Sequence, residues 1–197
     1  MVHVVITGGA GFLGSRLARE LLAAGSLDVA GGGARPLSRV TLIDQAPVPP
    51  DLAADERVTS IRGDLGELLD PLASGAGPLA GAEVIFHLAA AVSGQCEADF
   101  DLGIRANLRS TEALLACCRA LGTGPVVVFS SSLAVFGDSA DHPLPEVVDD
   151  QTFSAGRSRP ADPCFSMGCV DQMGDEREDQ AGAGPGSREQ QDNHPGW

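Results

Sequence analysis

The stretch VHVVITGGAGFLG, Val2–Gly14, decides the fold of this 197-residue chain. Its first half is a short apolar, β-branched run that predicts a buried strand over Val2–Thr7. Three regularly spaced glycines follow. We expect Gly8 to allow a tight turn, Gly11 to let the backbone approach a pyrophosphate, and Gly14 to let the next helix pack closely on the sheet. A plain glycine turn is the alternative.

The chain alternates between strand and helix patterns up to about residue 130. Leucines recur every four residues after the glycines, which predicts a helix that Gly25 ends. A glycine-rich connection is expected over Ser26–Leu37. Such alternation is typical of an α/β fold with a doubly wound parallel sheet. The expected strands are Val2–Thr7, Val40–Ile43, Arg57–Arg62, Glu83–Ala90 and Val126–Phe129, and the expected helices are Phe12–Ala24, Leu65–Leu72 and Phe100–Leu121.

Two aspartates follow predicted strands. Asp44 ends the second strand, where a carboxylate can bind both hydroxyls of an adenosine ribose and repel a 2′-phosphate, which favours NAD over NADP. It lies 30 residues beyond Gly14, against about 20 in the usual pattern, and the glycine-rich insertion accounts for the excess. A strand-end turn residue is the alternative. Asp64 could reach the adenine amino group, or it could cap the next helix.

Three consecutive serines follow the last apolar run in VVVFSSSLAVFG, Val126–Gly137. Their place is the carboxyl end of the predicted fifth strand, where α/β sheets bind ligands. A turn or a cap is the structural alternative. The position makes Ser130, Ser131 and Ser132 candidates for an active site.

The composition excludes several classes of partner. The formal net charge is −14, which argues against nucleic acid and anionic membranes as main partners. No apolar run has the length of a membrane span, and no secretory signal is recognised at the N-terminus, so we expect a cytoplasmic protein. The five cysteines show no metal-like pairing, so no metal is expected. A small-molecule ligand remains the expected partner.

The character of the sequence changes near residue 152. Residues 153–197 contain no leucine and no isoleucine, and they are rich in acidic, glycine and polar residues. Such a segment buries too little apolar surface to offset the entropy of ordering it. We therefore expect a partial nucleotide-binding domain over 1–152 and a disordered, low-complexity tail over 153–197. A truncated domain or a shifted reading frame is our hypothesis for the change.

Several motifs together resemble the extended short-chain dehydrogenase/reductases, which are NAD(P)-dependent epimerases, dehydratases and dehydrogenases. The motifs are TGGAGFLG at 7–14, GDL at 63–65, HLAA at 87–90, Asn107, and FSSSLAVFG at 129–137. The resemblance covers about residues 1–152. It implies a Rossmann-type sheet with strand order 3-2-1-4-5 and NAD as the cofactor. A narrower likeness, carried by HLAAAVSGQCEADFDLGIRANL, is to members that oxidise a hydroxyl of a small sugar acid.

The resemblance also implies roles for individual residues. Ser132 matches the catalytic serine, which holds the hydroxyl or carbonyl of the substrate. Val92, Ser93 and Gly94 match a loop that approaches the substrate. Asn107 matches a structural asparagine in the helix beside the cofactor. The residues expected at the cofactor are Gly8, Gly11, Phe12, Leu13, Gly14, Asp44, Asp64, Leu65, Leu88, Ala89, Ala90, Asn107, Ser130 and Ser131.

One departure from the family pattern is decisive. In these enzymes a tyrosine with a lysine four residues later moves the proton, and this chain contains neither residue type. Three interpretations stay open: a sugar-acid dehydrogenase in its complete form, an inactive dinucleotide-binding fragment, and a non-catalytic NAD-sensing protein. The helix that would carry the tyrosine lies beyond the match, so we expect one side of the fifth strand to be uncovered.

Overall fold

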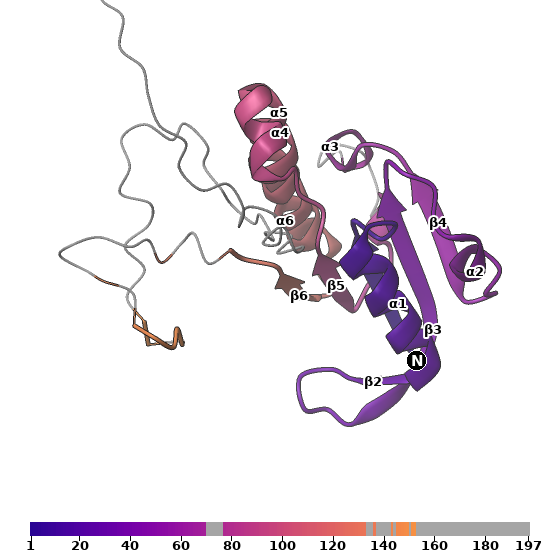
Figure 1. Cartoon of the computed structure of the whole chain (residues 1–197). Coiled ribbons are helices and arrows are strands. Elements are labelled where there is room, and N and C mark those ends of the chain that lie inside the picture. The colour runs from indigo at the N-terminus through magenta and orange to yellow at the C-terminus, as the bar shows by residue number, and fades with distance from the viewer. Residues whose placement is uncertain (70–76, 133–135, 137–142, 144, 150, 153–197) are drawn as a thin grey trace, which may run out of the picture.

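The structure is a computed structural model, and it describes residues 1–69, 77–132, 136, 143, 145–149 and 151–152. A central sheet has helices on either side (Figure 1). No helix in this described part of the chain is both long enough and apolar enough to cross a membrane. The predicted disordered tail over 153–197 lies outside the described residues.

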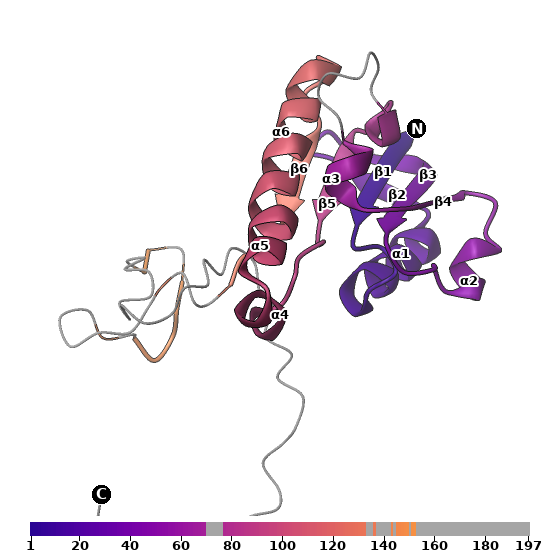
Figure 2. The ribbon, with the colours of Figure 1, turned by 90° about the horizontal axis from the view of Figure 1, so that it is seen from above.

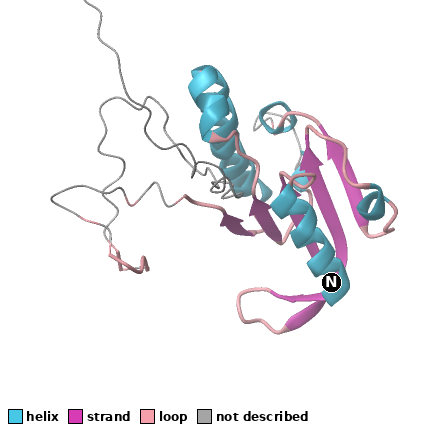
Figure 3. Cartoon of the chain, viewed as in Figure 1, coloured by secondary structure: helices cyan, strands magenta, loops and turns pink. Residues whose placement is uncertain are grey.

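Five parallel strands form the sheet, and one short antiparallel strand extends it (Figure 3). β1 (Val2–Thr7) lies between β3 (Ala34–Asp44) and β5 (Val84–His87). Outside these, β4 (Val58–Arg62) pairs with β3, and β6 (Val126–Phe129) pairs with β5. When only the parallel strands are counted, the order is 3-2-1-4-5. The predicted Rossmann-type topology is therefore confirmed.

Apolar side chains of β1 fill two layers because neighbouring residues of a strand face opposite sides. Val4 and Ile6 belong to the layer that contains Ala18, and Val5 belongs to the layer that contains Leu114. The sheet is thus covered on both faces, as a doubly wound fold requires (Figure 2). The covering elements are α1 (Phe12–Ala24) and α2 (Pro50–Ala53) on one face, and α3 (Leu65–Leu68), the 3₁₀ turn η1 (Gly77–Leu79) and α6 (Ser110–Leu121) on the other.

The connection after α1 forms a β-hairpin instead of a plain loop. β2 (Ser26–Asp28) runs antiparallel to the first residues of β3. The turn between the two strands needs positive φ angles, which Gly31 and Gly33 adopt at 74° and 88° without steric cost. The prediction of a connection over Ser26–Leu37 was therefore wrong, and β3 extends to 11 residues.

The helix expected over Phe100–Leu121 is continuous but not uniform. α5 (Phe100–Gly103) passes into the π-helical turn η2 (Ile104–Arg109) and then into α6. The hydroxyl of Ser110 donates to the carbonyl of Arg105 at 2.8 Å, five residues earlier, which fits the wider turn. Apolar spacing alone did not predict this change of helix type.

Three further elements differ from expectation. β5 ends at His87, although the N–H of Leu88 still donates to the carbonyl of Thr7 at 3.2 Å, and the next residues lie against Gly8 of the glycine loop. α3 is a single turn that ends at Leu68. α2 was not predicted, and it begins at Pro50, a residue whose fixed φ suits a first helical position.

β6 is poorly covered at the edge of the sheet. Val126, Val128 and Phe129 are 37%, 45% and 65% exposed, whereas β5 beside them is almost fully buried. The expectation of an uncovered fifth strand therefore agrees with the described residues.

Candidate dinucleotide-binding site

The glycine loop fits against its neighbours so closely that several of its glycines leave no room for a Cβ. Gly8 has φ +70°, and a Cβ there would lie 2.9 Å from the backbone nitrogen of Ala89. A Cβ on Gly14 would lie 2.2 Å from the carbonyl oxygen of Gly8. These distances confirm the tight turn and the close packing predicted for the two glycines. Gly9 is constrained as well, since its Cβ would lie 2.8 Å from that of Leu42, and sequence reasoning did not single it out.

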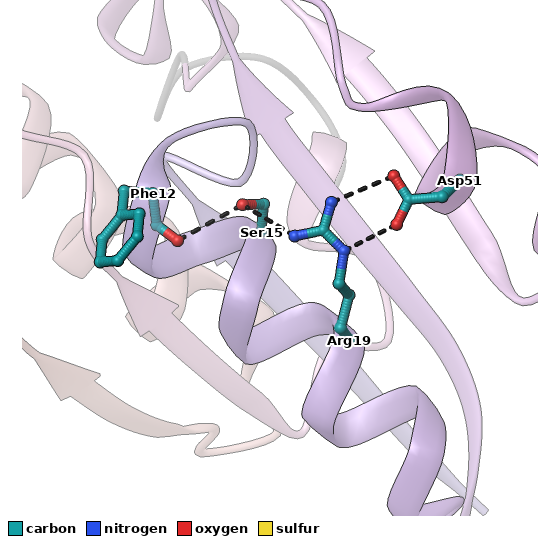
Figure 4. A network of polar contacts seen from close by, with 4 residues as sticks. All are labelled: Phe12, Ser15, Arg19 and Asp51. Atoms are coloured by element: carbon teal, nitrogen blue, oxygen red, sulfur yellow. Dashed lines mark hydrogen bonds and ion pairs between the residues drawn. The ribbon is translucent and has the colours of Figure 1, made fainter.

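α1 begins at the glycine loop without a side-chain cap. Gly11 is the N-cap residue, and no side chain accepts from the first turn. In Figure 4 the hydroxyl of Ser15 donates to the carbonyl of Phe12, and Arg19 reaches from Ser15 to Asp51 of α2. This network lies along the side of the helix. The N–H groups and the positive dipole end of this 13-residue helix therefore suit a phosphate.

Asp44 joins the end of β3 to the glycine loop. Its Oδ2 accepts from the backbone N–H of Ala10, and its Oδ1 accepts from that of Ala46, both at 2.9 Å. Asp44 thus forms the strand-end turn through Ala46 and also lies beside the glycine loop through Ala10. The carboxylate is held at the mouth of the site, where a ribose could meet it.

Asp64 caps α3. Its Oδ1 accepts from the backbone N–H of Gly66 at 2.8 Å and of Glu67 at 3.4 Å. Its Oδ2 accepts from the side-chain amide of Gln45 at 2.9 Å. The capping alternative is confirmed, and the contact with adenine stays a prediction.

The segment 88–91, which follows β5, lines the site and is held by hydrogen bonds to two polar side chains. The hydroxyl of Thr7 accepts from the N–H of Ala89 at 3.2 Å. The side-chain amide of Asn107 accepts from the N–H of Ala91 at 2.7 Å and donates to its carbonyl at 3.0 Å. Asn107 thus holds Ala91 at the end of this segment, a contact that fits the structural role implied by the resemblance.

His87 is buried between two threonines. The hydroxyl of Thr111 donates to the carbonyl of Asn107 at 2.7 Å, so its oxygen accepts from Nε2 of His87 at 2.9 Å. Nδ1 of His87 then accepts from the hydroxyl of Thr7 at 2.7 Å. Burial lowers the pKa of His87, and the neutral ring satisfies both threonine partners. This chain of bonds joins β1, β5 and α6 beneath the site.

Two cavities open at the carboxyl ends of the strands, and both are lined by Ala89 and Ala90. The first, of about 450 Å³, lies between the ends of β1, β3 and β4 and the helical residues Gln95, Leu102, Ala106 and Ser110. The second, of about 400 Å³, lies between β6 and α6. Of the predicted residues, Gly8, Gly11, Asp44, Asp64, Leu65, Leu88, Ala89 and Ala90 line the first, and Ala89, Ala90, Asn107, Ser130 and Ser131 line the second.

The other predicted residues do not line either cavity. Phe12, Leu13 and Gly14 form the first turn of α1, with Phe12 73% exposed. Ser132 follows the lining residue Ser131 directly. Ser93 and Gly94 begin α4 (Ser93–Ala98), so the loop expected there is a short helix.

Sequence reasoning missed several residues of the first cavity. Gln45, Gln95 and Ser110 line it together with Ala46, Gly63, Ala91, Leu102 and Ala106. Gln45 directly follows Asp44, and this position beside a predicted site residue is the one sequence signal that could have identified it. Gln95 lies in α4, which the sequence did not predict, and Ser110 begins α6 directly after the π-helical turn.

The fold and the cavity agree with comparisons to known proteins. The sequence pattern of the NAD dependent epimerase/dehydratase family matches residues 4–163. The chain belongs to this family. The resemblance to the extended short-chain dehydrogenase/reductases is thereby confirmed, and NAD is the cofactor that this family and fold use.

The names of several relatives of this epimerase/dehydratase family member refer to sugar-derived molecules. D-erythronate dehydrogenase from Cupriavidus necator is 48% identical over 151 residues, which are 77% of this chain and 44% of the relative. Two solved structures match 79% and 82% of this chain: the nucleoside-diphosphate-sugar epimerase from Agrobacterium tumefaciens (37% identity, TM-score 0.60, 43% of its length) and MoeE5 in complex with UDP-glucuronic acid and NAD (29% identity, TM-score 0.58, 44% of its length). The chain spans less than half the length of these proteins.

The residues of the first cavity fit NAD on their own chemistry. Gly8 and Gly14 let the loop pack where a Cβ would collide with the backbone, the first turn of α1 offers backbone donors, and Asp44 offers a carboxylate beside the loop. A pyrophosphate and a ribose would each therefore have a chemically matched neighbour.

Proposed function

We propose that this chain is the NAD-binding part of an enzyme that oxidises a hydroxyl of a small sugar acid such as D-erythronate. The observation that carries the proposal is the 450 Å³ cavity, which gathers the glycine loop, Asp44, Asp64 and the segment 88–91. The 48% identity to D-erythronate dehydrogenase supports the substrate class. A cytoplasmic location remains a prediction.

Each part of the cofactor has its proposed residues. Gly8, Gly11 and the first turn of α1, which contains Phe12, Leu13 and Gly14, would hold the pyrophosphate. Asp44 would hold the adenosine ribose, and its negative charge would repel the 2′-phosphate of NADP. Asp64 and Leu65 would hold the adenine. Leu88, Ala89 and Ala90 would lie along the cofactor between the two cavities.

The substrate would sit where the second cavity meets the serine run. Bound NAD supplies the hydride acceptor. The hydroxyl of Ser132 would hydrogen-bond to the substrate hydroxyl, next to Ser130 and Ser131 at the end of β6. Ser93 and Gly94 in the first turn of α4 would limit the space for the substrate.

These 197 residues lack one group that the reaction needs. Oxidation of a hydroxyl releases a proton, and the sequence offers no tyrosine or lysine to take it. We therefore propose that this chain binds NAD without turning over a sugar acid. The same absence favours a second candidate, a non-catalytic NAD-binding protein.

A chimera separates the two candidates. Residues 1–152 would replace the matching segment of the Cupriavidus necator D-erythronate dehydrogenase, and NADH formation with D-erythronate would be measured. We expect NADH from the chimera and none from the chain alone. Ser132→Ala in the chimera should lower kcat/KM by about 100-fold or more. A folded, NAD-binding chimera without activity would favour the non-catalytic candidate.

A further inference from the structure

We propose that Gln45 is a positioning residue for cofactor recognition: its side-chain amide orients the Asp64 carboxylate so that the carboxylate accepts the 6-amino group of adenine. The inference rests on the proposed function, since it assumes that the first cavity binds NAD. It concerns a residue outside the glycine loop and outside the motifs that carry the family resemblance.

The ends of β3 and β4 hold Gln45 in place. The backbone N–H of Gly63 donates to the carbonyl of Asp44 at 3.0 Å, which continues the pairing of the two strands. The guanidinium of Arg62 donates through Nε to the carbonyl of Gln45 at 2.9 Å. The backbone of Gln45 is thus tied to β4, and its side chain spans the short distance to Asp64.

The hydrogen bonds of Asp64 leave one acceptor position for a ligand. Oδ1 takes the N–H groups of Gly66 and Glu67, and Oδ2 takes the amide of Gln45. A carboxylate oxygen can accept two hydrogen bonds. Oδ2 therefore keeps one lone pair, and both Gln45 and Asp64 line the first cavity.

The orientation of this carboxylate decides what it can recognise. With Oδ1 committed to α3 and Oδ2 bonded to Gln45, the plane of the carboxylate is fixed by bonds at both of its oxygens. A carboxylate accepts but does not donate, so it favours a base with an amino group at position 6 and repels a base with a carbonyl there. Nicotinamide hypoxanthine dinucleotide carries that carbonyl and is otherwise the same as NAD.

The test measures the preference for NAD over nicotinamide hypoxanthine dinucleotide by calorimetry on the full chain. We expect the wild type to prefer NAD by about tenfold or more. Gln45→Met keeps the length of the side chain and removes its amide, and it should reduce this preference to about threefold or less. Asp64→Asn, which still caps a helix well, should abolish the preference. In the Asp64→Asn background, Gln45→Met should change nothing further.

The controls separate positioning from general damage. Gln151→Met makes the same change at an exposed glutamine outside the cavity and should leave the preference intact. Thermal unfolding without ligand should be the same for wild type and Gln45→Met, because Gln45 is exposed. If Gln45→Met weakens both dinucleotides equally, or neither, the inference is wrong while NAD binding stands. If the folded wild type binds neither dinucleotide, the proposed function fails and the inference with it.

Discussion

The Oδ2 atom of Asp44 accepts the backbone N–H of Ala10 at 2.9 Å, although the two residues are 34 positions apart. This bond ties the carboxyl end of β3 to the glycine loop that follows β1. It places a fixed negative charge between the part of the site suited to phosphate and the part suited to ribose. The hairpin of β2 and β3 lengthens the spacing between Gly14 and Asp44 in the sequence. It lies at the other end of β3 and leaves this geometry unchanged.

Asp44→Asn should relax the choice of cofactor. Asparagine keeps an acceptor for one of the two backbone N–H groups that Asp44 holds, those of Ala10 and Ala46. It loses the charge that repels a 2′-phosphate, so the preference for NAD over NADP should fall by about tenfold. Calorimetric affinities for both dinucleotides measure this. Asp28→Asn is the matched control, because Asp28 accepts from Gly33 in the distant hairpin. An unchanged preference in Asp44→Asn would contradict the role of the charge.

Gly14→Ala should destabilise the chain strongly. The added methyl group would lie 2.2 Å from the carbonyl oxygen of Gly8, which is backbone and cannot move aside cheaply. We expect a loss of about 3 kcal/mol or more in the free energy of unfolding, measured with urea. Gly94→Ala should cost little, because nothing lies within 4 Å of a Cβ there. Equal stabilities of the two variants would contradict the packing described for the loop.

Local patterns predicted most of the parallel sheet. The β-branched run before Gly8 and the leucine period after it predicted β1 and α1 with the bounds that the structure shows. Asp44 was recognised in spite of its late position, because the end of a buried strand is itself a signal. The serine run was likewise placed correctly after β6.

The features that were missed depend on contacts between distant residues. The glycines of 26–37 indicate a turn as readily as a loop, and only pairing with β3 makes β2 a strand. The π-helical turn is the exception, since the bond from Ser110 to Arg105 that fits it is local, but the apolar spacing does not encode it. Gln45 is an ordinary exposed polar residue in the sequence, and only the pairing of β3 with β4 brings Asp64 within hydrogen-bond distance of it. Tertiary pairing therefore supplied what the sequence pattern lacked.

His87 should make the stability of the chain depend on pH. Burial lowers its pKa below the ordinary value of 6.5, so below that value the unfolded chain binds a proton that the folded chain resists. The contribution to stability is complete above about pH 6.5 and is lost as the pH falls, by at most about 1.4 kcal/mol per pH unit.

Urea unfolding at about pH 7 and about pH 5 measures this dependence. His87→Gln should show a smaller difference between the two conditions than the wild type. His3 contributes a separate dependence of the same sign, because burial and the nearby Arg39 lower its pKa as well; the His3→Gln variant isolates the share of His87. A wild type whose stability is equal at both pH values would contradict the burial of a neutral ring.

Val128→Lys should reduce self-association. Val128 lies on the edge strand β6 and is 45% exposed, and an open, apolar edge strand invites pairing with another chain. A lysine there should raise the monomer fraction in sedimentation velocity. Val147→Lys adds the same charge at an exposed valine outside β6 and should have no such effect. If both variants act alike, net charge and not the edge of the sheet controls association.

The central claim is that the carboxyl ends of β1, β3, β4 and β5 form an NAD site, and calorimetric titration of the full chain with NAD tests it most directly. We predict saturable binding of one NAD per chain, weakened by Asp44→Asn and retained in Asp28→Asn. A chain that is folded by circular dichroism and shows no saturable heat with NAD would contradict the claim.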